Sequence, residues 1–192
     1  MDCYEGAFRI RFIKLGTDHV DIAATRNNMG VVHMKNGEND KAMECLEVAL
    51  RIRETHMGKD HEKVGDTLHN IGLVHKNKKE YERAIECYER ALRIRKTKND
   101  NTKLADTFYN MGIVYANHGG YKVALSHYKE ALECYRKTGL LDDHPSVVNT
   151  LQWIKWADRQ VQKQTQKQQQ EKDGQDEDAS ITTTATTATI TL

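Results

Sequence analysis

The sequence predicts an all-α solenoid, a fold in which pairs of helices stack side by side in one direction. Three observations predict it. A tripeptide of the form Asn-Met/Ile-Gly recurs at residues 28–30, 70–72 and 110–112. Two alanines seven residues apart follow each copy, and apolar residues at three- and four-residue spacing surround the second alanine. Self-similarity at a period of this kind is typical of repeat proteins, whose units bury their apolar faces only against neighbouring units.

The three glycines of these tripeptides give each repeat a steric constraint. Gly30, Gly72 and Gly112 lie inside helical patterns, where a glycine costs about 1 kcal/mol relative to alanine. Their recurrence at one phase predicts a place where a partner helix approaches too closely for a Cβ atom. We expect the facing surface to be the alanine twelve residues after each glycine, namely Ala42, Ala84 and Ala124.

The first element is an unpaired helix. Residues 1–14 align with the second helix of a repeat, because Ala7 precedes Ala49 by the same interval that separates Ala49 from Ala91. Either the chain is a fragment that lacks the first helix of this repeat, or the helix is a cap. A cap needs a polar outer face, whereas this helix carries four apolar residues, Phe8, Ile10, Phe12 and Ile13. We therefore expect an exposed apolar patch and self-association through it.

Three complete repeats follow, at residues 19–57, 61–98 and 101–138. Pro145 then begins a fourth first helix, at a position where a missing N–H is harmless. Residues 144–170 are expected to form a C-terminal capping helix, which becomes polar towards its end. Residues 171–192 are first acidic and then rich in Thr and Ala, without an amphipathic period, so we predict a disordered tail.

The landmarks resemble those of the tetratricopeptide repeat, whose signature includes Leu-Gly-x2-Tyr followed by Ala-x3-Phe. An apolar residue, a glycine and then His or Tyr stand in this pattern at residues 29–33, 71–75 and 111–115. Longer repeats with a Gly-x-Asp-His connector are similar to those of kinesin light chains and nephrocystin-type proteins. That connector occurs at residues 16–19 and 58–61. The resemblance covers roughly residues 1–158 and implies a right-handed α-solenoid.

The same resemblance implies a peptide-binding groove. First helices of such repeats line a concave wall, and the residue two positions before each glycine faces it, here Asn28, Asn70 and Asn110. An Asn amide offers a donor and an acceptor together, so a ladder of amides can hold peptide backbone. Neighbouring positions on the wall are expected to select the ligand: Asn27, His69, Tyr109, Val31, Leu73 and Ile113. The alternative is that these asparagines bond to an adjacent helix.

The charge of this wall does not favour an acidic ligand. Some family members hold a terminal carboxylate with Lys or Arg on first helices, and kinesin light chains are readers of acidic, Trp-containing cargo peptides. The matching positions here are Asp66, Asp106, Asn27 and His69. On the repeats and the groove that the resemblance implies, we expect a kinesin light chain-like scaffold or adaptor that binds peptide segments of other proteins. The alternative is a structural fragment of a larger repeat protein, or of a sensor with a separate effector domain.

Composition argues against other classes of partner. The net charge of +1 gives no nucleic-acid footprint. No long apolar run predicts a membrane span, and the first residues show no signal peptide, so we expect a cytoplasmic location. Three of the cysteines share one phase of the repeat: Cys3, Cys45 and Cys87. Equivalent atoms of stacked helices lie roughly 8–10 Å apart, beyond disulfide reach, so these and Cys134 are expected to be free thiols.

No catalytic residue, cofactor site or metal site is predicted, and we do not expect an enzyme. The nine His form no His-Glu-x-x-His motif, and Cys-x-x-Cys, Gly-x-Ser-x-Gly and phosphate-loop patterns do not occur. His33 and His75 stand where the family carries Tyr, so they are expected to pack. The histidines of the connectors are expected to cap helices or bond within loops: His19, His61 and His144.

Overall fold

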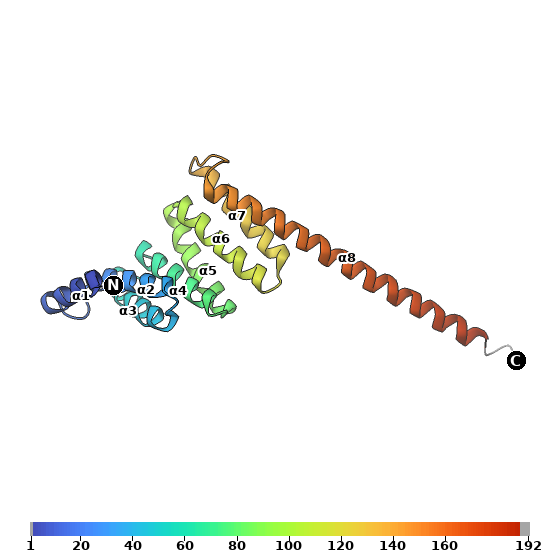
Figure 1. Ribbon diagram of the computed structural model, residues 1–192, viewed down its shortest axis with the longest axis horizontal. Coiled ribbons are helices and arrows are strands. Elements are labelled where there is room, and N and C mark those ends of the chain that lie inside the picture. The colour runs from blue at the N-terminus through green and yellow to red at the C-terminus, as the bar shows by residue number, and fades with distance from the viewer. Residues whose placement is uncertain (1, 189–192) are drawn as a thin grey trace.

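The computed structural model describes the backbone of residues 2–188 and the side chains of residues 4–171. In this part of the chain there are eight helices and no strand: α1 (Asp2–Leu15), α2 (Val20–Lys35), α3 (Asn39–Met57), α4 (Glu62–Asn77), α5 (Tyr81–Lys98), α6 (Asn101–Asn117), α7 (Tyr121–Lys137) and α8 (Pro145–Ala188). The prediction of an all-α solenoid is confirmed. Figure 1 shows the helix pairs stacked one after another, with α8 extending away from them as a long rod.

The helices form three hairpins, α2/α3, α4/α5 and α6/α7, each joined by a short turn. The second helix of each hairpin packs on the next unit, so that α3 contacts α4, α5 contacts α6 and α7 contacts α8. α1 packs on α2 in the same way. The first helices also touch one another, α2 with α4 and α4 with α6. We call the surface built by α2, α4, α6 and the beginning of α8 the first-helix face.

The glycines of the first helices lie where helices approach most closely. A Cβ atom on Gly72 would stand 2.6 Å from Cε1 of Tyr88, and one on Gly112 would stand 2.5 Å from Cε1 of Tyr128. Carbon atoms in ordinary contact are about 3.5–4.0 Å apart. The structure therefore has no room for a side chain at these positions, as the sequence predicts.

The group that faces each glycine differs from the prediction. The sequence pattern predicts the alanine twelve residues after each glycine, but the nearest atoms belong to the side chain four residues further on, Tyr88 or Tyr128. At Gly30 the equivalent Leu46 Cγ would be 2.7 Å from a Cβ atom, and Ala42 contributes only its carbonyl oxygen, at 3.1 Å. The larger side chain one turn later on the second helix reaches across the interface, and the alanine leaves room for the backbones to approach.

Histidines cap three of the first helices. The Nδ1 atoms of His19, His61 and His144 accept the backbone N–H two residues further on, at 3.1, 3.2 and 3.2 Å. The capping role predicted for the connector histidines is therefore confirmed. α6 has no such histidine, and Oδ1 of Asp100 accepts the N–H of Lys103 instead, at 3.1 Å.

The turn inside each hairpin uses one residue in the left-handed conformation. This residue is Gly37 in the first hairpin and Gly119 in the third, but it is Lys79 in the second, with φ at 61°. Next to this turn, Nδ1 of His75 lies 2.6 Å from Oε2 of Glu80, and its hydrogen bond lowers the pKa of that carboxyl. His33 makes the equivalent contact with a glutamate at 2.6 Å. Both histidines pack as half-buried side chains, as expected.

α1 leaves part of its apolar surface uncovered. Ile13 is 82% exposed, Ile10 58% and Phe12 45%, whereas Phe8 packs on the cluster that contains Ile22. The exposed patch that the sequence predicts is therefore present. Self-association through it stays a prediction.

α8 is packed near its start and exposed beyond it. Val147, Thr150 and Ala157 are fully buried, and every side chain described after Val161 is exposed. The sequence predicts a disordered tail at 171–192, whereas the backbone continues as helix to Ala188. Residues 189–192 lie outside the described residues. Residues 162–172 are nearly all Gln, Lys and Glu, which are good helix formers and favour helix there without a packed partner. Disorder of the tail stays a prediction.

Candidate functional site

Polar side chains gather in a cleft of about 480 Å³ on the first-helix face. Three first helices contribute to it, and the C-terminal halves of α3 and α5 each add one arginine. We call it the polar cleft. Its lining consists of Ala24, Asn27, Asn28, Arg53, Lys63, Asp66, Asn70, Arg95 and Lys103.

The two arginines tie successive repeats together, and both are only 6% exposed. Nη1 of Arg53 donates to Oγ1 of Thr67 at 2.5 Å and to the carbonyl oxygen of Lys63 at 2.9 Å. One repeat later, Nη1 of Arg95 makes the same two contacts. It donates to Oγ1 of Thr107 and to the carbonyl oxygen of Lys103, the latter at 2.8 Å. Each second helix is thus fastened to the next first helix by an arginine–threonine contact.

The same contact also occurs at the first junction, but it changes at the last. Nη1 of Arg11 donates to Oγ1 of Thr25 at 2.5 Å. At the junction between α7 and α8, Tyr135 stands one repeat after Arg95, and its hydroxyl donates to Oδ1 of Asp106 at 2.6 Å. This series of arginine–threonine contacts is not among the features predicted from the sequence. The signal that could have found it is an arginine at one phase of three successive second helices, each followed by a threonine at the start of the next first helix.

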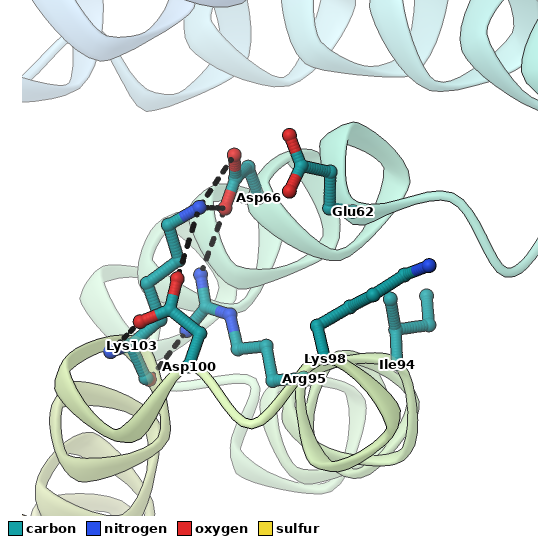
Figure 2. A pocket seen from close by; sticks show the side chains of 7 residues that line it. All are labelled: Glu62, Asp66, Ile94, Arg95, Lys98, Asp100 and Lys103. Atoms are coloured by element: carbon teal, nitrogen blue, oxygen red, sulfur yellow. Dashed lines mark hydrogen bonds and ion pairs between the residues drawn. The ribbon is translucent and has the colours of Figure 1, made fainter.

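Asp66 is the one carboxylate among the side chains that line the polar cleft. Its Oδ1 lies 3.4 Å from Nη2 of Arg95 and 3.2 Å from Nζ of Lys103, and its Oδ2 lies 3.8 Å from Nζ of Lys63. Figure 2 shows Arg95 and Lys103 converging on this carboxylate from two different helices. With Arg53, four cations line the cleft, and Nζ of Lys103 is also 3.4 Å from Oδ2 of Asp100. Counting both carboxylates against the four cations, an excess of two positive charges remains.

All three predicted ladder asparagines have protein partners, but only Asn70 and Asn110 bond across to another helix, since Asn28 accepts from Nδ2 of its neighbour Asn27, at 3.5 Å. Nδ2 of Asn70 donates to Oδ1 of Asn27 on α2, at 3.2 Å. Nζ of Lys76 on α4 donates to Oδ1 of Asn110, at 2.9 Å. These contacts join neighbouring first helices, as the alternative interpretation expects. Asn28 is exposed, and it lines the polar cleft together with Asn70.

The other predicted wall residues lie along the same face. Nη1 of Arg95 is 3.2 Å from Nδ1 of His69, and burial together with this guanidinium lowers the pKa of His69 to about 3, so the imidazole is neutral. The hydroxyl of Tyr109 accepts a hydrogen bond from Nδ2 of Asn149, at 2.9 Å. The apolar members of the set are half-buried: Val31, Leu73 and Ile113.

A second hollow, of about 400 Å³, lies between the end of α6 and α8. Its lining is Asn117, Asn149, Gln152, Trp153 and Trp156. The rings of Trp153 and Trp156 are 5.3 Å apart at an angle of 78°. Trp153 stands as far after the capping His144 as Asn70 stands after His61, so an aromatic ring continues the series of asparagines on the first-helix face. We call this place the aromatic hollow.

Other chemistry finds little support in the described side chains. They contain no group of three His, Cys, Asp or Glu placed to hold a metal ion. Cys45, Cys87 and Cys134 are free thiols, as predicted, and Cys3 lies outside the described side chains. Burial raises the pKa of Cys87 to about 11, which keeps that thiol protonated. Among the described residues no helix combines the length and the apolar character that a bilayer crossing needs.

Comparisons with known proteins bear on this arrangement. A family model described as tetratricopeptide repeat matches residues 21–97 and again 63–137. No curated protein gives a significant match. The crystal structure of BtubC (BKLC) from P. vanneervenii is similar, with a TM-score of 0.72 and 21% identity, over 82% of this chain and 63% of that one.

Two further solved structures are similar. A putative kinesin light chain of Podosopora anserina with nearly identical TPR-like repeats has a TM-score of 0.69 and 17% identity, over 88% of this chain and 80% of that one. The apo form of RapI has a TM-score of 0.70 and 24% identity, over 82% of this chain and 57% of that one. The chain thus spans less than two thirds of BtubC and of RapI, and at these identities the likeness concerns the fold.

Proposed function

Because the chain belongs to the tetratricopeptide repeat family, we propose that it is a non-catalytic scaffold or adaptor that binds extended peptide segments of other proteins along its first-helix face. Repeats of this fold are suited to protein–protein interaction, since stacked units create an extended concave surface. The observation that carries the proposal is the polar cleft, whose lining comes from three successive first helices. The cytoplasm is the proposed location, because the described cysteines are unpaired.

The dimensions of the face suit a short extended segment. Neighbouring packed helices lie about 8–10 Å apart, so three first helices span about 16–20 Å. An extended chain advances about 3.3 Å per residue, so five or six residues cross the polar cleft. The next residues of the same segment would reach the aromatic hollow at Trp153, which offers apolar ring surface.

The charge of the polar cleft supports acidic side chains in the ligand, in contrast to the expectation from sequence. That expectation rested on Asp66 and Asp106. Asp66 is surrounded by Lys63, Arg95 and Lys103, so its negative charge is paired within the cleft. Asp106 keeps its charge, with a hydrogen bond from the hydroxyl of Tyr135, but it is not among the residues that line the polar cleft. The excess of positive charge attracts an acidic segment and speeds its association.

The amides supply contacts that do not depend on ligand sequence. Asn28 is exposed at the cleft, and Asn70 donates to Asn27 with only one of its two N–H groups. A peptide bond lying over them therefore finds both a donor and an acceptor. Asn110 is engaged by Lys76, so we assign the backbone contacts to Asn28 and Asn70.

A peptide array probed with the whole chain tests the proposal. We expect bound sequences to weaken roughly tenfold when Asn28→Ala and Asn70→Ala are combined, because two backbone contacts worth about 0.5–1.5 kcal/mol each are lost. The matched control is Asn77→Ala, an exposed asparagine at the end of α4. An array with no bound sequence, or binding that the double variant leaves unchanged, contradicts the proposal.

The uncovered surface of α1 favours a second candidate, in which the repeats associate with one another or form part of a larger repeat array. Ile10 stands one repeat before Ile52, which is fully buried inside a complete repeat. Its exposure, with that of Phe12 and Ile13, leaves apolar area that association would bury. Light scattering of the pure chain tests self-association. We expect a concentration-dependent increase in mass that Ile13→Lys abolishes, and a monomer at high concentration contradicts it.

A further inference from the structure

The two ends of the hairpin stack differ in whether another helix can join them. In each hairpin the second helix crosses the first helix over two small residues. One of these places carries glycine in every hairpin, and the other carries glycine or alanine: Gly30, Gly72 and Gly112 at the one, Ala23, Gly65 and Ala105 at the other. A Cβ atom on Gly65 would stand 3.2 Å from Cγ2 of Ile94 on the second helix. A first helix therefore accepts its second helix only where both places are small.

α8 is a first helix without a second helix, and both of these places are filled in it. Counted from the helix cap, Val148 stands at the place of Gly65, and Lys155 stands at the place of Gly72. Val148 is 38% exposed, and Lys155 is also exposed. Their side chains take up the space that the backbone of a second helix needs. The stack is therefore closed at α8, and α1 of another copy cannot pack there as a second helix does in the hairpins.

α1 is the reverse case, a second helix without a first helix, and its exposed side is more apolar than the repeat requires. Ile13 is 82% exposed and Phe12 is 45% exposed. At the place of Phe12 the three hairpins carry charged residues, and at the place of Ile13 they carry threonine or lysine: Glu54, Lys96 and Arg136, and Thr55, Thr97 and Lys137. First helices thus pack on second helices that are polar at these places. The apolar pair on α1 suits a partner that differs from a first helix.

A second copy of α1 matches this apolar surface. Nine large apolar side chains are exposed in the part of the chain whose side chains are described, and five of them belong to α1: Tyr4, Ile10, Phe12, Ile13 and Leu15. The other four are scattered over α7, the connection between α7 and α8, and α8 itself. The surface that α1 exposes on one copy is therefore covered most fully by the same surface of another copy.

The exposed area indicates a weak and reversible pairing. If a large side chain has about 200 Å² of surface, Ile10, Phe12 and Ile13 together expose about 400 Å², and two copies bury about 800 Å² in all. Specific interfaces usually bury about 1,200–2,000 Å². A pair formed through α1 is thus expected to dissociate on dilution.

The exposed charges of α1 favour an antiparallel pair. Glu5 lies in the first half of the helix, Arg9 and Lys14 lie in the second half, and all three are exposed. Among the described residues, Glu5 and Lys14 have no ion-pair partner within 4.0 Å. Two antiparallel copies bring the acidic half of each helix to the basic half of the other, and their helix dipoles oppose each other.

We propose that α1 pairs with α1 of a second copy about a twofold axis, and that the assembly ends at two chains. The inference rests on the second candidate function proposed above and names its partner and its stoichiometry. A twofold interface uses the same surface on both copies, so none of this surface is left for a third copy. The closed end at α8 prevents head-to-tail growth. Each dimer presents two first-helix faces.

Sedimentation equilibrium of the pure chain tests the stoichiometry. We expect the mass to rise with concentration to that of two chains and to stop there, and Ile13→Lys to remain a monomer over the same range. Leu141→Lys is the control, because Leu141 is 72% exposed outside α1, and this variant should pair as the wild type does. A mass that rises beyond two chains overturns the twofold pairing and leaves self-association standing. A wild type that stays monomeric overturns self-association itself, whereas the peptide array tests the scaffold function independently of both.

A mixing experiment shows which surface of the second copy α1 meets. Fluorescently labelled Ile13→Lys is titrated with unlabelled wild type. In a twofold pair the substituted face must itself meet the wild-type face, so we expect this affinity to be about tenfold lower than that of labelled wild type, since burial of an isoleucine is lost. If α1 docked elsewhere on the other copy, Ile13→Lys would still offer that surface intact. Nearly equal affinities therefore overturn the proposal.

Charge substitutions test the antiparallel arrangement. Glu5→Lys and Lys14→Glu each place like charges at both ends of a pair with itself, so each should pair more weakly than the wild type. An equimolar mixture of the two variants restores opposite charges at each end, and it should form a mixed dimer more readily than either variant pairs alone. A mixture that pairs no better than the separate variants overturns the antiparallel pairing.

Discussion

Replacing Gly72 with alanine tests the close packing on which the repeat depends. The new Cβ atom would stand 2.6 Å from Cε1, 2.9 Å from Cδ1 and 3.0 Å from Cζ of Tyr88. Since carbon contacts are normally about 3.5–4.0 Å, the ring or the whole of α5 must shift by about 1 Å. Tyr88 is fully buried, and the imidazole of His69 lies 5.5 Å from its ring centre. The ring therefore has no free space to move into.

Two opposing effects set the size of the change in stability. Alanine is favoured over glycine in a helix by about 1 kcal/mol, whereas overpacking of a well-packed core costs about 1–3 kcal/mol. Because three ring carbons are approached at once, we place the overpacking cost of Gly72→Ala at the upper end of that range. The expected net loss of unfolding free energy is about 2 kcal/mol, which corresponds to a decrease in melting temperature of about 4–8 °C for a chain of this size.

Urea denaturation followed by far-UV circular dichroism measures this loss. Gly6→Ala is the control, because Gly6 lies in α1 and a Cβ atom there meets nothing within 4 Å. Gly6→Ala should cause no loss. Gly72→Ala should also become less harmful in a Tyr88→Ala background, where the obstructing ring is gone. If Gly72→Ala is as stable as the wild type, the close approach does not constrain this position, and the steric account of the repeat is wrong.

Three further predictions use the same denaturation assay. Lys79→Gly should raise the unfolding free energy by about 1 kcal/mol, because Lys79 has φ at 61°, and an unchanged or lower value would contradict this. His61→Ala should lower the unfolding free energy by about 1 kcal/mol, because the α4 cap is lost, whereas His61→Asn should keep most of the cap's contribution. Equal losses of unfolding free energy in the two variants would argue against capping. His69 has its pKa lowered to about 3 in the folded state, so the unfolded chain binds a proton first as the pH falls below about 6.5. Between pH 6 and 4, each pH unit of acidification should therefore lower the unfolding free energy of the wild type by about 1.4 kcal/mol more than that of His69→Gln. A difference in unfolding free energy between the two proteins that does not change with pH would refute this prediction.

Much of the fold could be predicted from the sequence because the constraint that fixes it is periodic. Gly72 and Gly112 recur at one phase, and a missing side chain inside a helix has few explanations other than close packing. The same periodicity located the histidine caps, since His19 and His61 stand in copies of one connector. The group facing each glycine was less predictable, because it depends on how far a side chain such as Tyr88 reaches across the interface.

The candidate site was predicted less well, because its electrostatics come from contacts between repeats. From the sequence, Asp66 is an acidic residue on the groove wall. In the structure, Arg95 from α5 and Lys103 from α6 meet at its carboxylate, and neither stands at a helical spacing from it. Likewise, the asparagine pattern indicates which face Asn70 and Asn110 occupy, but not that Asn27 and Lys76 bond to them.

The rod of α8 has a consequence for how the molecule moves in solution. A helix of 44 residues is about 66 Å long, and most of its second half lies clear of the hairpins in Figure 1. A compact globule of 192 residues would have a radius of gyration of about 16 Å. A particle with such an arm tumbles and diffuses more slowly than its mass implies. It will therefore leave a gel-filtration column early even as a monomer. A direct measurement of mass is needed to distinguish such an elongated monomer from a dimer formed through α1.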